Sequence, residues 1–217
     1  YDSSDTTYTD YPNGDYFYYY KKILAKDYHI GMGYDHDNHN TTFGRSTGGR
    51  LVVLANSLTE PNLIDAMQKM HFYGSDDWNC QMDFKINSNI MGDSTSGLTY
   101  PTINITHNDL DGELADSIKI WSGVEGSGSF STVLSFVKSS NTLSFTDNTM
   151  APGSNKYYFV EVIQNDGDRI ITSPIWYRVS NLVGIKELKN DFIFLMFPNP
   201  VNGVLSSSTN LNENFSI

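Results

Sequence analysis

The chain has a single cysteine, Cys80, among its 217 residues. One thiol cannot form a disulfide bond within the chain, so a fold held together by disulfides is excluded. We expect Cys80 to serve as a small buried hydrophobic residue. The composition supports folding without such cross-links, because 39% of the residues are hydrophobic and 13% are aromatic. These fractions are sufficient for a hydrophobic core.

Positive charge is also scarce. Fourteen lysines and arginines stand against 25 aspartates and glutamates, which gives a formal net charge of −11. This excess of negative charge argues against nucleic acid or an anionic membrane as the main partner. It is compatible with an exported protein.

Long apolar runs are missing as well. No stretch reaches the roughly 20 residues that a transmembrane helix needs. The chain begins at Tyr1, with neither a methionine nor a charged-then-apolar signal segment before the first polar residues. At the other end, a new apolar segment begins at 192–197, shortly before the last residue. Both ends look cut, and we expect the chain to be a fragment of a longer protein.

The first 96 residues carry signals of mixed α/β structure. An aromatic run at 16–25 predicts a helix, and 29–34 predicts a short strand. The continuous apolar run RLVVLA at 50–55 has the length of a buried parallel strand. A second helix follows, with Pro61 in its first turn and an apolar stripe behind it. This order predicts the end of an α/β unit.

From about residue 80 the hydrophobic pattern alternates with a period of two, as in 82–86, 102–106 and 117–121. Two apolar runs within 156–179 flank the turn sequence NDGD, which predicts a hairpin. Closely spaced strands without a helical pattern predict an all-β sandwich of the immunoglobulin or fibronectin kind over 97–180. We expect residues 181–217 to form a linker and the beginning of a further domain.

Two aspartates and two histidines lie within five residues, at 35–39. Carboxylate and imidazole groups together suit Zn, Mn or Fe. On an extended chain the side chains of Asp37 and His39 point the same way, so both can face one ion. Asp35 shares that face, as a further ligand or as an acceptor that orients His39. His36 faces away and is the remaining candidate. The alternative interpretation is an ordinary polar turn.

Arg45 and Arg50 follow this cluster. A guanidinium group can hold a phosphate oxygen bidentately beside a metal ion, so both are candidate substrate-binding residues. The alternative is that they are ordinary arginines at the surface or at a strand end.

Two other acidic segments are weaker signals. Asp76 and Asp77 could bind a cation, although a solvated turn is the simpler interpretation. The segment DLDG at 109–112 is partly similar to a calcium loop, but Ile118 stands where that template needs its final glutamate. We interpret it as a β-turn.

Several blocks together resemble the polymerase-and-histidinol-phosphatase (PHP) family, in its secreted phosphoesterase-like branch. The blocks are DNH at 37–39, FGR at 43–45, RLVVLA at 50–55, LTE at 58–60 and FYGSDD at 72–77. The resemblance implies the C-terminal portion of a distorted β/α barrel over 1–96, with metal ligands at Asp37 and His39. KYYFV at 156–160, QNDGD at 164–168 and TSPIWY at 172–177 resemble the β-domain appended in this branch. The His-x-His motif of the family has no counterpart in residues 1–34.

The segment FPNPVNGV at 197–204 resembles the start of a C-terminal sorting domain of the type IX secretion system of Bacteroidetes-like bacteria. This resemblance implies export, attachment at the cell surface or release, and the secretion machinery as a partner.

Two hypotheses about function follow. In the first, the chain belongs to a secreted metal-dependent phosphoesterase that acts on a phosphorylated small molecule or a phosphodiester. In the second, it belongs to a secreted non-catalytic protein on a decayed barrel, which binds carbohydrate or protein. Aromatic residues at 16–20, with Trp121, Trp176 and Tyr177, could then form a sugar-binding platform, although core packing is the default role of aromatics in strands.

Overall fold

The computed structural model describes residues 16–37, 39, 41 and 48–180, and the backbone of the strands β13 (Leu195–Pro198) and β14 (Leu205–Ser208). The chain divides into two units, Tyr1–Asn181 and Leu182–Ile217. In the second unit, β13 and β14 pair in antiparallel fashion. The elements discussed below all belong to the first unit.

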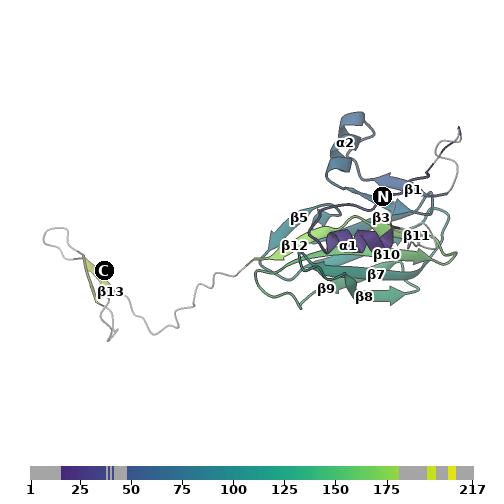
Figure 1. Ribbon diagram of the computed structural model, residues 1–217. Helices are drawn as coiled ribbons and strands as arrows, with labels where there is room; N and C mark the ends of the chain where they lie inside the picture. The colour runs from purple at the N-terminus through teal and green to yellow at the C-terminus, as the bar shows by residue number, and fades with distance from the viewer. Residues whose placement is uncertain are drawn as a thin grey trace, which may run out of the picture. The chain divides into compact units, whose positions relative to one another are not determined.

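The first unit is mainly β-structure (Figure 1). Its helices are α1 (Phe17–Leu24) and α2 (Glu60–Gln68). Its strands are β1 (Arg50–Val53), β2 (Phe72–Ser75), β3 (Gln81–Ile86), β4 (Asn89–Ile90), β5 (Ser94–Gly97), β6 (Thr102–Asn108), β7 (Ala115–Val124), β8 (Thr132–Lys138), β9 (Thr142–Thr146), β10 (Asn155–Gln164), β11 (Arg169–Thr172) and β12 (Ile175–Val179). The larger sheet has eight strands, and the smaller one has the order β4-β3-β6-β9.

Strand β10 is the centre of the larger sheet. It pairs with β7 along one side, and β8 pairs with β7 beyond it. On its other side, the first half of β10 pairs with β12 and the second half with β11. The sheet continues from β11 through β2 to β1, and from β12 to β5. All these pairs are antiparallel except β12 with β5.

The main core lies between the two sheets. Met82, Phe84 and Ile86 alternate along β3 and pack in one cluster with residues of the larger sheet such as Ile118 and Val160. The intervening residues of β3 are exposed or half-buried, as expected for a sheet with one covered face. Each fully buried side chain of this kind stabilises the fold by about 1.5–3 kcal/mol.

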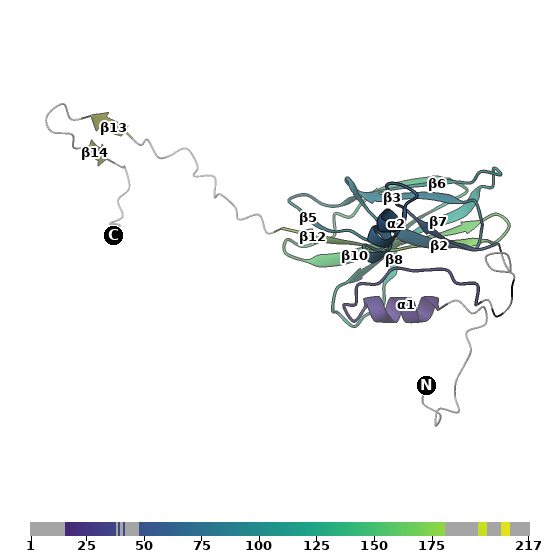
Figure 2. The same ribbon diagram turned by 90° about the horizontal axis from the view of Figure 1, so that it is seen from above.

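Helix α1 covers the opposite face of the larger sheet. Phe17, Tyr20 and Leu24 form its apolar stripe and pack against Tyr157 and Phe159 of β10. Figure 2 shows α1 on one side of this sheet and β3 and β6 on the other. Because β10 is covered on both faces, its sequence YYFV at 157–160 is apolar at successive positions rather than alternating, and the buried Glu161 interrupts this run.

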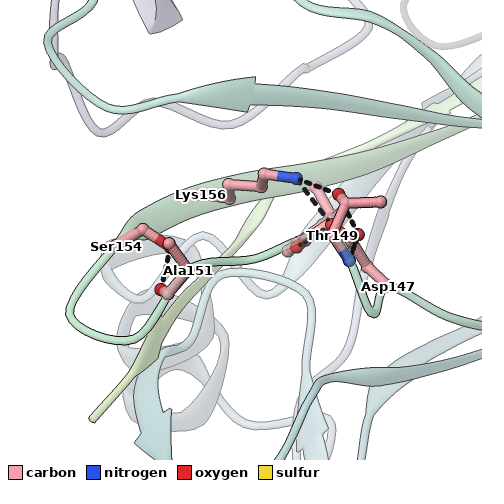
Figure 3. Close-up of polar contacts among 6 residues, drawn as sticks. Asp147, Thr149, Ala151, Ser154 and Lys156 are labelled. Atoms are coloured by element: carbon pink, nitrogen blue, oxygen red, sulfur yellow. Dashed lines mark hydrogen bonds and ion pairs between the residues drawn. The ribbon is translucent and has the colours of Figure 1, made fainter. Parts of the chain in front are cut away.

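A buried polar network secures the connection between β9 and β10 (Figure 3). The Asp147 side chain is fully buried. It accepts hydrogen bonds from Lys156 Nζ at 2.8 Å and Tyr158 Oη at 2.7 Å. Thr149 bonds the other carboxylate oxygen through its hydroxyl and backbone N–H. Burial opposes ionisation of Asp147, but the Lys156 ammonium and the hydroxyl donors hold its pKa below the usual 3.8.

The expectation of an α/β barrel portion is wrong, because this part of the chain joins two mostly antiparallel sheets. The run at 50–53 forms β1, which pairs antiparallel with β2 at the edge of the larger sheet. Residues 29–34 form no regular strand. A short apolar run has no periodicity that distinguishes a buried parallel strand from a half-buried antiparallel one.

The expected succession of an α/β portion and a separate immunoglobulin-like or fibronectin-like sandwich is not observed either. Strands on both sides of residue 97 share each sheet: β3 pairs with β6, and β2 pairs with β11. The local predictions were more successful, since both helices and the hairpin within 156–179 are confirmed.

Candidate functional site

The Asp/His cluster lies between α1 and β1, in a segment without regular secondary structure. The His39 Nε2 and Asp37 Oδ1 atoms are 2.9 Å apart. Both side chains face solvent, with exposed fractions of 84% for His39 and 89% for Asp37. Asp37 has a φ of 43°, so the chain turns here and is not extended. The two side chains meet as expected, but a left-handed turn brings them together.

The other residues of this cluster have different surroundings. The His36 ring donates from Nε2 to the Gly49 carbonyl over 2.7 Å and packs edge-on against Tyr34. This hydrogen bond occupies one ring nitrogen and ties the segment to the start of β1. Asp35 is exposed.

Of the two candidate phosphate-binding arginines, Arg45 lies outside the described residues, and so do Asn38 and Asn40. Arg50 is half-buried at the start of β1. Its Nη1 atom donates to the carbonyls of Gly48 and Gly49, over 3.0 and 2.7 Å. These contacts hold the guanidinium group beside the turn that also receives His36.

Within the described ranges, two groups of three potential metal ligands come together. The first consists of Asp27, His29 and Glu125. The His29 ring stacks on Trp176, with 4.0 Å between the centroids, and its Nε2 lies 3.9 Å from Glu125 Oε1. Partial burial raises the pKa of Glu125 despite the nearby imidazole. Two of the three residues are exposed, and the group forms an open surface cluster.

The second group consists of Asp77, Asp109 and Glu113, from the segments that follow β2 and β6. Sequence reasoning interpreted both segments as turns: 109–112 fails the calcium-loop template, and a solvated turn was the simpler interpretation of Asp76 and Asp77. The available signal was the acidic character of DD at 76–77 and DLDGE at 109–113. Only the pairing of strands reveals that these segments meet.

The aromatic residues divide between core and surface. Trp176 and Tyr177 are buried, and Trp121 packs against the α1 cluster, so the default expectation of core packing holds for them. Tyr16 and Tyr19 are 66% and 39% exposed. Tyr18 packs edge-on against Phe130, whose ring is 41% exposed. We call Tyr16, Tyr18, Tyr19 and Phe130 the aromatic surface.

No protein-family model matches the chain, and no curated protein matches it. The resemblance to the PHP family therefore rests on the sequence blocks alone. In the described part of the chain, neither helix has the length and apolar character required to cross a bilayer. Most of the resemblance to a sorting domain, at 197–204, falls outside the described residues.

Proposed function

We propose that the chain contributes Asp37 and His39 as two ligands of a divalent-metal site in an exported, phosphoesterase-like hydrolase. The observation that supports this proposal is the solvent-facing pair itself, with 2.9 Å between the carboxylate and imidazole atoms. A carboxylate and an imidazole in contact suit Zn, Mn or Fe. Two ligands are fewer than a complete site requires, so the others come from outside the described residues.

The hydrogen bond within the pair has a chemical consequence. When the His39 Nε2–H group donates to Asp37, the lone pair of the neutral ring is at Nδ1. Asp37 Oδ1 then fixes the tautomer and the orientation of the ring, and Oδ2 of the same carboxylate is left to bind the ion. A bound divalent ion supplies hydroxide near neutral pH and neutralises charge on phosphoryl oxygens. Asp37 and His39 would hold that ion in place.

The test is hydrolysis of p-nitrophenyl phosphate and bis-p-nitrophenyl phosphate by the full-length protein, supplied in turn with Zn²⁺, Mn²⁺ and Fe²⁺. His39→Ala should lower the metal-dependent rate at least a hundredfold with an unchanged circular dichroism spectrum. Thr41→Ala, an exposed change close by, is the matched control. A His39→Ala protein as active as the control would overturn the proposal.

The aromatic surface favours a second candidate, a non-catalytic module that binds saccharides. Its tyrosines lie on α1 and at the N-cap of that helix, and Phe130 lies on the loop between β7 and β8. Exposed tyrosine and phenylalanine faces stack on the apolar faces of sugar rings. Affinity electrophoresis through polysaccharide gels tests this function. Retardation that is lost in Tyr18→Ala with Phe130→Ala, but kept in Tyr28→Ala, would support it; equal mobility of all variants would exclude it.

A further inference from the structure

The group Asp77, Asp109 and Glu113 lies where β2, β6 and β10 end. Asp77 follows β2, and the other two residues lie in the connection from β6 to β7. The backbone N–H of Asn165 donates to the Leu114 carbonyl over 3.0 Å, which joins this connection to the end of β10. One carboxylate oxygen from each acidic residue lies within 4.8 Å of the other two. The group therefore joins segments that are distant in the sequence, and it depends on how the strands pair.

Two of these three carboxylates are enclosed, and Glu113 is half-buried. Asp77 and Asp109 are 6% and 8% exposed, and Gln164 beside them is 1% exposed. None of the ion pairs in the described residues connects a lysine or arginine to this group. Three negative charges at such distances in a partly enclosed site repel strongly without a counter-ion.

The hydrogen bonds present compensate only part of this charge. Asp109 Oδ1 accepts from the backbone N–H groups of Asp111 and Glu113, over 2.8 and 3.0 Å. Gln164 Nε2 reaches Asp77 Oδ2 at 3.3 Å and Glu113 Oε2 at 3.4 Å, which are long distances for hydrogen bonds. A single amide group thus bridges two carboxylates weakly.

Two enclosed oxygen atoms, Asp109 Oδ2 and Gln164 Oε1, receive no hydrogen bond from an N–H group or hydroxyl of the described residues. Asp77 can donate to Asp109 only when its own carboxyl group carries a proton. A buried acceptor without a partner is costly. Turning the Gln164 amide by half a turn would exchange its oxygen and nitrogen atoms, so that Oε1 faces Asp77 and Glu113. That orientation removes both hydrogen bonds of Nε2 and moves the nitrogen to the place where Oε1 has no partner, so it is favourable only with a cation between the oxygen atoms. A cation in this position satisfies Gln164 Oε1, Asp109 Oδ2 and the surplus negative charge together.

The ligand chemistry selects the cation. The group offers carboxylate and amide oxygens, which Ca²⁺ prefers, with six to eight oxygens at about 2.3–2.6 Å. Asp166 and Asp168 in the β10–β11 turn add negative charge close by, which attracts cations from solution.

We propose that Asp77, Asp109 and Glu113 bind one Ca²⁺ ion, with the side-chain oxygen of Gln164 as a further ligand. The ion ties the segments after β2 and β6 to the end of β10 and stabilises this end of the sandwich. This inference is independent of the hydrolase proposal, since it uses none of the residues at 35–39.

The test is calcium titration of chelator-treated protein by isothermal titration calorimetry and thermal unfolding, with Mg²⁺ and Zn²⁺ in parallel. We expect one site, with a dissociation constant of about 1 mM or tighter, and a higher Tm in Ca²⁺. Asp109→Asn should weaken binding at least tenfold, whereas Asp83→Asn on β3, which changes an exposed carboxylate paired with Lys85, should not.

Glu113→Gln is a second variant, chosen in case Asp109→Asn fails to fold. The Glu113 side chain is only half-buried, so its replacement should not prevent folding. Without calcium this variant should be at least as stable as the wild-type protein, since the change relieves repulsion; its calcium-dependent rise in Tm should be reduced. A purely structural carboxylate would show the opposite result without calcium. The proposal is overturned by no calcium response in the wild-type protein, by unchanged binding in both variants, or by tighter binding of Zn²⁺ than of Ca²⁺. His39→Ala should leave calcium binding intact.

Discussion

Glu161 and Arg169 face each other across the β10–β11 hairpin, with 2.7 Å between Glu161 Oε1 and Arg169 Nη2. The same carboxylate lies 3.2 Å from Lys119 Nζ and 3.0 Å from Trp121 Nε1. The Arg169 guanidinium also lies over the Phe17 ring, 4.4 Å from its centroid. One buried carboxylate therefore joins β7, β10 and β11, and its arginine partner extends the connection to α1.

Glu161→Gln should destabilise the fold, because it leaves two cations beside an uncharged amide. Burial opposes ionisation of Glu161, but Arg169 and Lys119 hold its pKa below the usual range. We expect a loss of about 2–3 kcal/mol, below the range for fully enclosed pairs, since Arg169 and Lys119 are 20% and 34% exposed. Chemical denaturation measures it. Asp83→Asn breaks an exposed pair and should cost at most about 0.5 kcal/mol; equal losses would contradict the role assigned to Glu161.

The Asp147 network should make stability depend on pH in the acid range. The folded-state pKa of Asp147 lies below 3.8, so its contribution is fully present above that value. The contribution is lost as pH falls through the folded pKa. Asp147→Asn should remove about 2 kcal/mol at neutral pH and less at pH 2–3. Chemical denaturation of the wild-type protein and the variant across this pH range measures the difference in their free energy of unfolding. A difference that stays constant at all pH values would refute the assignment.

In the calcium-free protein, Asp77 and Glu113 should make stability depend on pH in the opposite direction. Burial and the neighbouring Asp109 raise the pKa of Asp77 above 3.8, and burial with Asp166 raises that of Glu113 above 4.5. A raised folded pKa gives a contribution that is present below the unfolded pKa and is lost as pH rises through the folded one. Asp109 has a pKa below 3.8, because backbone N–H groups and Asp77 offset its burial, so its contribution is present above that value. Above pH 4 the calcium-free protein should therefore gain stability from Asp77 and Glu113 on mild acidification. Saturating Ca²⁺ should abolish that gain in Tm measurements between pH 4 and 7.

Gly92 should tolerate no side chain. Its φ is +94°, and a Cβ atom there would overlap the backbone at the end of α2, at Lys69 and Met70. Gly92→Ala should cost about 3 kcal/mol, the sum of left-handed strain and a clash with backbone atoms. Gly167→Ala is the matched control, because Gly167 also has a positive φ, +102°, but an added Cβ atom would meet no neighbouring atom within 4 Å. Gly167→Ala should lower the free energy of unfolding by only about 1–2 kcal/mol. An equal loss in both variants would show that backbone strain, and not the clash at Gly92, accounts for the effect.

The local elements were predictable because their signals are local. Pro61 and the apolar stripe that follows it define α2, and the NDGD turn at 165–168 defines the β10–β11 hairpin. The barrel prediction was wrong at 50–53, where four apolar or long side chains in succession carry no periodicity. The strand exists, but its partner and the direction of pairing depend on β2, which lies beyond α2 in the sequence.

The candidate sites also divide into contacts that are local in the sequence and contacts that depend on strand pairing. The sequence by itself placed a carboxylate and an imidazole two residues apart, at Asp37 and His39; it predicted an extended chain there, whereas a left-handed turn at Asp37 brings the two side chains together. It also determined which stretches are apolar enough to be buried, since burial follows from side-chain chemistry. Only the tertiary structure decided that Asp77 meets Asp109 and Glu113. Contacts between residues so far apart in sequence depend on which strands pair, and that choice minimises the free energy of the whole packed sandwich rather than of any segment.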